Sequence, residues 1–77
     1  HNRDNHRRFA DLLARLPEVQ EAHALTGEMD YHLKVVTRDL RALSDFVNEV
    51  LLPHESVQHV KTAIVLQTLK EHGALPL

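Results

Sequence analysis

Apolar residues near the start of the chain recur at the spacing of one helical face. They follow a polar and charged segment over residues 1–8 and fall at i, i+3, i+4 and i+7, as Phe9, Leu12, Leu13 and Leu16. This spacing predicts an amphipathic helix that packs on a core. The candidates for its N-terminal cap are Asn2, Asp4 and Asn5. Pro17 ends the helix, because the residue before a proline avoids the helical region.

A pattern of period two follows this helix. Tyr31, Leu33 and Val35 alternate with polar neighbours, which predicts a strand with one buried face. Ala22 and Ala24 alternate in the same way, although more weakly. A short loop around residues 26–30 separates the two stretches and contains a glycine, so we expect a β-hairpin.

A second helical stripe lies in the middle of the chain, made by Leu40, Leu43, Phe46, Val47, Val50 and Leu51. Asp39 or Thr37 can cap this helix, and Pro53 ends it. The last segment, Val57–Lys70, is rich in β-branched residues and predicts a strand whose central part, 63–66, is buried on both faces. A loose tail follows.

The predicted order is therefore helix, strand, strand, helix, strand. With one more strand in front it becomes β-α-β-β-α-β, the ferredoxin-like arrangement of the α+β class. In that fold the first strand lies in the middle of the sheet, next to the last one, and a gap there leaves backbone groups unpaired. We therefore expect a strand before His1 in the native protein, whether it was cut off, is disordered or comes from another chain.

Composition narrows the classes of function. The 77 residues make at most one domain, with 43% apolar and 26% charged residues, as in ordinary globular proteins. The chain has no cysteine, which excludes disulfides and thiolate zinc sites. Its net charge of −2 argues against nucleic-acid binding by this chain alone, because such modules are normally basic. Aromatic residues make up only 4%, too few for a base-stacking platform, and no apolar run reaches the length of a membrane span.

An ordered set of motifs covers about residues 9 to 70. The run over 16–31 reads LPEVQEAHALTGEMDY, a D-L-x-x-L-x-x-F-V helix starts at Asp39, and a β-branched strand begins at Val57. Together these motifs resemble the C-terminal regulatory domain, also called the RAM domain, of the Lrp/AsnC family of transcription regulators. The T-G-x-x-D piece alone is common, whereas the full set at this spacing is specific.

The resemblance implies a fold and a function. It implies that residues 1–77 form one effector-binding and oligomerisation domain, ferredoxin-like, that dimerises into an α/β sandwich or barrel and assembles further into tetramers or octamers. It also implies a small effector, usually an amino acid, bound between dimers, and DNA binding through a separate N-terminal helix-turn-helix domain that this sequence does not contain. A cytoplasmic regulator without enzymatic activity, cofactor or metal is the expectation.

The candidate effector site follows from the same resemblance. An amino acid needs an acceptor for its ammonium group and donors for its carboxylate, and a glycine loop with acidic neighbours supplies both. Asp30 matches the family's acidic residue near the effector's amino group, although it also fits a residue that only stabilises a turn. The candidate effector-binding residues are Thr26, Gly27, Glu28, Met29, Asp30, Tyr31 and Thr62.

Three of these candidates carry alternatives. Met29 stands where family members often have an aromatic residue, so a flexible thioether would reshape the pocket for a different effector. Tyr31 either lies by the pocket or is buried, and burial is the favoured interpretation. Thr62 matches a position near the effector cleft, but a threonine is also common in a strand for its propensity alone.

Histidines invite a metal hypothesis, because there are seven of them: His1, His6, His23, His32, His54, His59 and His72. None forms a helical H-x-x-x-H pair. The best pair, His23 and His32, faces across the hairpin only if the loop is centred on residues 27–28, and two ligands make a weak site. A pH effect on assembly or ordinary surface positions fit better. The arginines of the first helix, at 3, 7, 8 and 15, are interspersed with acids, which favours a solvated face over a DNA-binding one.

Two other functions are alternatives to that of a transcription regulator. One is a stand-alone metabolite-sensing or scaffold domain without a DNA-binding partner. The other is a small dimeric α/β-barrel enzyme, because one fold hosts many functions. The enzyme is disfavoured, since His23, His32 and Asp30 are the only acid–base candidates and no nucleophile accompanies them.

Overall fold

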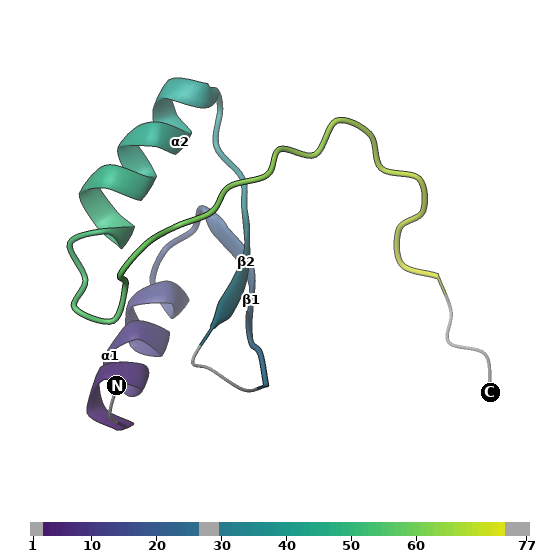
Figure 1. Ribbon diagram of the computed structural model, residues 1–77. Helices are drawn as coiled ribbons and strands as arrows, with labels where there is room; N and C mark the ends of the chain where they lie inside the picture. The colour runs from purple at the N-terminus through teal and green to yellow at the C-terminus, as the bar shows by residue number, and fades with distance from the viewer. Residues whose placement is uncertain (1–2, 27–29, 74–77) are drawn as a thin grey trace.

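Helices α1 and α2 lie on one side of a two-stranded antiparallel hairpin in the computed structural model, which describes residues 3–26 and 30–73 (Figure 1). The elements in chain order are α1 (Arg3–Ala14), β1 (Val19–Ala24), β2 (Tyr31–Val35), α2 (Leu40–Phe46) and η1 (Val47–Leu51). The predicted order of the first four elements is confirmed, and η1 continues α2 as a wider π-helical turn.

Helix α1 forms where its apolar stripe predicts it, with Phe9 and Leu13 buried. The cap prediction is partly wrong, because Asp4 and Asn5 lie within the helix, where their own backbone is already helical. Asn2, the third candidate, lies outside the described residues. The end of the helix tightens before Pro17, where the Leu16 N–H donates to the Leu13 carbonyl at 3.2 Å.

The hairpin has the register that the alternating pattern requires. Ala22 pairs with Leu33 and Ala24 with Tyr31, with one irregularity between Val19 and Glu21. Cross-strand partners point to the same face of a sheet. The partly buried side chains of Tyr31 and Leu33 pack against the core, so the two alanines face the helices as well.

Helix α2 begins at the predicted cap. The Asp39 carboxylate accepts a hydrogen bond from the Ala42 N–H at 2.8 Å, which satisfies one of the unpaired donors of the first turn. Thr37, the alternative cap, instead donates from its hydroxyl to the Asp39 carbonyl at 3.1 Å. After Phe46 the backbone widens, and the Leu52 N–H donates to the carbonyl of Val47, five residues earlier, at 2.9 Å.

A small core joins the two helices to the hairpin. Phe9 and Leu13 of α1 meet Phe46 and Leu51 there, each at most 6% exposed. The turn after η1 is fastened to α1 by an ion pair between Arg8 and Glu55 and by neighbouring polar contacts. The partly buried residues around this core are Leu12, Leu16, Val19, Tyr31, Leu33, Val35, Val47, Val50 and Val57.

The predicted strand over Val57–Lys70 is wrong for the chain as the structure describes it. This segment contains no helix or strand. It starts at Val57, which packs against the core, and then runs away from the helices and the hairpin as an irregular coil (Figure 1). Its centre, expected to be buried on both faces, is open: Ile64 is 57%, Val65 75% and Leu66 95% exposed. A strand needs a neighbour for its backbone N–H and C=O groups, and the described sheet contains only β1 and β2. The strand expected before His1 stays a prediction.

Candidate functional site

Three of the predicted effector residues, Thr26, Asp30 and Tyr31, lie at the loop end of the hairpin. There the Leu25 N–H donates to the Asp30 carbonyl at 2.9 Å, which brings Thr26 and Asp30 to the ends of the connecting loop. Both residues are exposed, so the Asp30 carboxylate is accessible to a ligand from solvent. Gly27, Glu28 and Met29, the centre of the predicted site, lie outside the described residues.

Tyr31 links this end of the hairpin to the first helix. Its ring is half-buried and lies 4.8 Å from the ring of Phe9, with the two planes tilted by 59°. Its hydroxyl hydrogen-bonds Nδ1 of His6 at 2.5 Å, and the two rings stack at 5.6 Å. Packing against α1 agrees with the burial that we favoured for Tyr31, and its effector-binding role stays a prediction.

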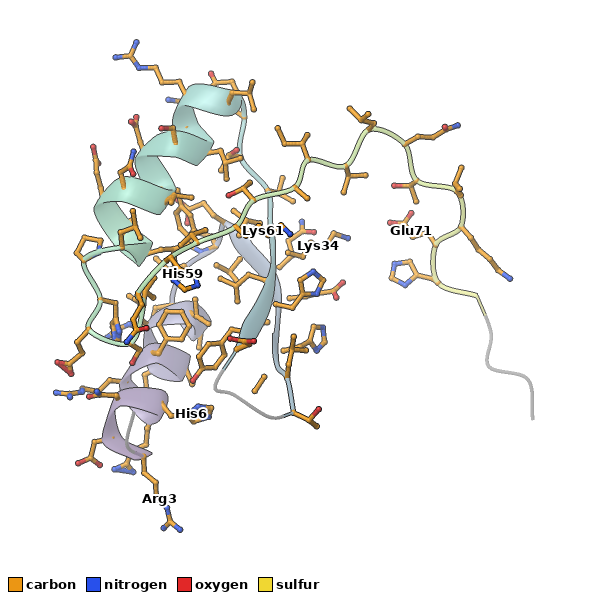
Figure 2. All side chains as sticks on the ribbon, viewed as in Figure 1. Arg3, His6, Lys34, His59, Lys61 and Glu71 are labelled. Atoms are coloured by element: carbon orange, nitrogen blue, oxygen red, sulfur yellow. The ribbon has the colours of Figure 1, made fainter. Side chains whose placement is uncertain are left out.

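Sequence reasoning did not assign His6 to this region. Figure 2 shows its side chain pointing from α1 toward the hairpin. A signal for it exists in the sequence, because His6 precedes Phe9 by three residues and Leu13 by seven, and so continues the apolar stripe of α1. A polar residue on such a stripe finds a partner where it meets the opposite element, here the Tyr31 hydroxyl.

Thr62 is not brought to the hairpin loop. It lies on the exposed segment that leaves the body near the far end of β2, opposite to the loop (Figure 1). Thr26, Asp30 and Tyr31 therefore form one group in the structure, and Thr62 stands apart from it.

A groove of about 410 Å³ runs between α1 and β1. Most of its lining is apolar and includes Leu13 and Val19, and it reaches Tyr31 and His6 at the loop end of the hairpin. A volume of this size falls within the range of small-molecule sites. Its other lining residues are Ala10, Ala14, Ala22 and Ala24, together with Gln20, Glu21 and His23 of β1.

The opposite face of the hairpin is polar and open. His23 and His32 are direct cross-strand partners, as predicted for a loop centred on residues 27–28. His23 donates to the Glu21 carboxylate at 3.3 Å, and Lys34 lies 3.9 Å from the same group. The hydrogen bond from His23 and the positive charge of Lys34 hold the pKa of the Glu21 carboxyl below its usual value. No cluster of three metal-ligating side chains occurs within residues 3–26 and 30–73.

A second hollow of about 450 Å³ lies at the other end of the hairpin, against α2. It is lined by Glu18, Asp45 and Glu49, together with Arg38 and apolar groups. One carboxylate oxygen of Glu18 is buried and has no hydrogen-bond partner among the described residues. Within residues 3–26 and 30–73, no helix is long and apolar enough to cross a membrane.

Comparisons with known proteins agree on one family. The family model described as "Lrp/AsnC ligand binding domain" matches residues 1–75. The transcriptional regulator AzlB of Bacillus subtilis is 33% identical over 76 residues, which are 99% of this chain and 48% of that protein. The leucine-responsive regulatory protein of Escherichia coli K12 is 31% identical over 67 residues, 87% of this chain and 41% of the relative.

Comparison with a solved structure supports the fold class. The crystal structure of a transcriptional regulator from Neisseria meningitidis in complex with L-Met is 39% identical and superposes with a TM-score of 0.87. The match covers 97% of this chain and 49% of that one, which confirms the ferredoxin-like α+β class. This chain spans about half the length of the relatives that it matches.

Proposed function

Because the chain belongs to the Lrp/AsnC ligand-binding domain family, we propose that it is the amino-acid-sensing and oligomerisation domain of a transcription regulator. One observation carries this proposal. A regulator that superposes on 97% of this chain at 39% identity was solved in complex with L-Met. The curated relatives are regulators of transcription too, and none of those cited is described as an enzyme.

The effector site of this proposal is the closed end of the hairpin. Asp30 accepts the effector's ammonium group, because its carboxylate is exposed where the strands meet. The loop residues Gly27, Glu28 and Met29 supply backbone donors for the effector's carboxylate, with Thr26 and Tyr31 at the two sides. Thr62 joins the site only if assembly brings its segment near a hairpin loop, and the segment is open for such a contact.

The proposal extends to assembly and to DNA. The domain forms homodimers that build tetramers or octamers in the cytoplasm, and effector binding alters DNA binding by a separate helix-turn-helix domain. Coupling of this kind requires two sites and at least two global states. A stand-alone sensor without a DNA-binding partner is the second candidate, and a helix-turn-helix in the full gene product decides between them.

Thermal unfolding of the full-length protein with each common amino acid tests the sensing function. A ligand that binds only the folded form stabilises it by mass action, by about 2.7 kcal/mol at a hundred times Kd. We expect a concentration-dependent rise in Tm with one or two amino acids, L-Met among those tested first. The rise should disappear in Asp30→Ala and persist in Asp11→Ala, which removes an exposed carboxylate from α1.

The same experiment can overturn the proposal. A Tm that does not move with any amino acid contradicts amino-acid sensing and leaves assembly as the better description. A rise that survives Asp30→Ala unchanged keeps the sensing function and moves the ammonium-binding group away from the hairpin loop.

A further inference from the structure

Four charged or titratable side chains lie together on the outer face of the hairpin, the face turned away from the helices. Glu21 pairs with Lys34, and His23 pairs with His32, across the two strands. Residues two apart on a strand point to the same side of the sheet, so all four side chains share this face. All four residues are exposed. Histidines change their charge between about pH 5 and pH 8, and here two of them are direct cross-strand partners.

The Glu21 carboxylate compensates only part of the positive charge that this face can acquire. One of its oxygens lies 3.3 Å from the His23 ring nitrogen, and the other lies 3.9 Å from the Lys34 ammonium group. These contacts, together with the charge of His72 in the C-terminal segment, lower the pKa of the Glu21 carboxyl, which therefore stays ionised where histidines titrate. Within the described part of the chain, the His32 ring has no hydrogen bond or ion pair.

Protonation of both histidines therefore leaves one positive charge uncompensated. His32 then lies opposite the cationic His23 and on the same face as Lys34, two residues further along β2. Like charges directly opposite each other on neighbouring antiparallel strands destabilise the pairing. Both oxygens of Glu21 are already engaged, so the hairpin is less stable when His23 and His32 are both charged.

The helix-facing side of the hairpin carries a different titratable contact. There His6 of α1 shares a hydrogen bond with the Tyr31 hydroxyl, which can both donate and accept. A protonated His6 donates to the hydroxyl oxygen, so this bond persists when His6 is charged. The outer face is therefore the part of the hairpin that acid weakens.

The histidine pair lies close to the loop end of the hairpin. The next pair is Ala24 with Tyr31, and beyond it the Leu25 N–H donates to the Asp30 carbonyl at 2.9 Å. Tyr31 is held by α1 through its ring and its hydroxyl, whereas Ala24 and Leu25 are exposed. Repulsion within the histidine pair can therefore open the loop end from the β1 side while the core stays packed.

We propose that His23 and His32 form a pH-sensitive pair that opens the loop end of the hairpin as the pH falls below neutral, and that this opening weakens effector binding. The second part rests on the proposed sensing function, because Thr26 and Asp30 of the candidate site lie at this end. The first part concerns the hairpin alone and is tested without a ligand.

Hydrogen exchange of the full-length protein at about pH 7.5 and about pH 5.5, inside the histidine range, tests the first part. Local opening lowers the protection of the amides around the loop, once it is corrected for the intrinsic exchange rate at each pH. We expect this protection to fall about two- to fivefold at the lower pH, the size of a cross-strand charge effect.

Four variants assign the effect to its groups. His23→Gln and His32→Gln each remove one charge of the pair, so either should abolish the fall in protection. Glu21→Gln removes the compensating carboxylate and should enlarge the fall. His59→Gln removes an exposed histidine outside the hairpin and serves as the matched control, which should behave as the wild type. Tm at neutral pH shows that each variant is folded.

Calorimetric titration with L-Met at the same two pH values tests the second part. The Kd of the wild type and of His59→Gln should rise about two- to fivefold at the lower pH, in step with the loss of protection. The Kd of His32→Gln should stay the same at both pH values.

Three results would overturn the inference. Protection that does not fall in the wild type, or that falls equally in His32→Gln, excludes the histidine pair as the pH-sensitive element. A fall in protection with an unchanged Kd for L-Met overturns the link to effector binding. A wild type that binds L-Met at neither pH overturns that link together with methionine sensing, whereas hydrogen exchange decides the histidine pair independently.

Discussion

Phe9 is the residue whose loss should damage the fold most. It is 3% exposed, and its ring lies 4.8 Å from that of Tyr31 and 5.1 Å from that of His54. It thus connects α1 to the hairpin and to the turn after η1. Truncation of a buried phenylalanine to alanine destabilises a protein by about 3–5 kcal/mol, the sum of lost transfer energy and a cavity. Against a total stability of about 5–15 kcal/mol, Phe9→Ala should bring the domain close to unfolding.

Urea unfolding followed by circular dichroism measures this loss, with Leu40→Ala as the matched control. Leu40 is a large apolar residue at the start of α2, but it is 66% exposed and lies outside the buried cluster. Its truncation should therefore change the free energy of unfolding by only about 0.5 kcal/mol. If Phe9→Ala and Leu40→Ala lower the stability by similar amounts, the core is not organised around Phe9 and the packing argument is refuted.

Two further predictions concern a helix cap and a surface carboxylate. Asp39→Ala removes the acceptor for the Ala42 N–H and should lower the free energy of unfolding by about 1 kcal/mol. Asp39→Asn keeps a side-chain acceptor and should lower it only slightly. Equal losses of stability in denaturant unfolding of the two variants would contradict the capping role. In an NMR titration Glu21 should have a pKa below that of an ordinary glutamate, and His23→Gln or Lys34→Gln should raise it. Because the pKa of Glu21 is lower in the folded than in the unfolded state, its ionised form stabilises the fold fully at neutral pH, and this stabilisation is lost as the pH falls through the folded-state pKa. An unshifted pKa in the wild type would refute the contacts.

Local patterns predicted the elements whose partners lie in the described chain. The stripes of both helices, the Asp39 cap and the alternation around Leu33 depend on neighbours a few residues away or on the next element. The widening of the backbone after Phe46 had no signal in the apolar spacing, because hydrophobic residues at i+4 and i+5 fit both kinds of turn. The strand from Val57 failed for a different reason, since a strand is defined by its pairing and not by propensity alone.

The site could be predicted only in part. The pairing of His23 with His32 depended on the length of the loop, which spacing alone left open. The contact between His6 and Tyr31 joins residues 25 apart, and only the packing of α1 on the hairpin brings them together. The groove was missed because alanines carry no chemical signal in a sequence, and the space that they leave exists only between two elements.

The open segment after the turn also affects how this chain behaves at high concentration. From Thr62 to Leu69 it has no charge and no proline, and Ile64 and Val65 favour extended backbone. Short uncharged stretches of this kind, when exposed, pair with copies of themselves and start aggregation. Lys61 and Lys70 flank the stretch and act as gatekeepers through charge repulsion. When the segment is exposed, neutralising these two lysines should therefore lower the solubility of the protein.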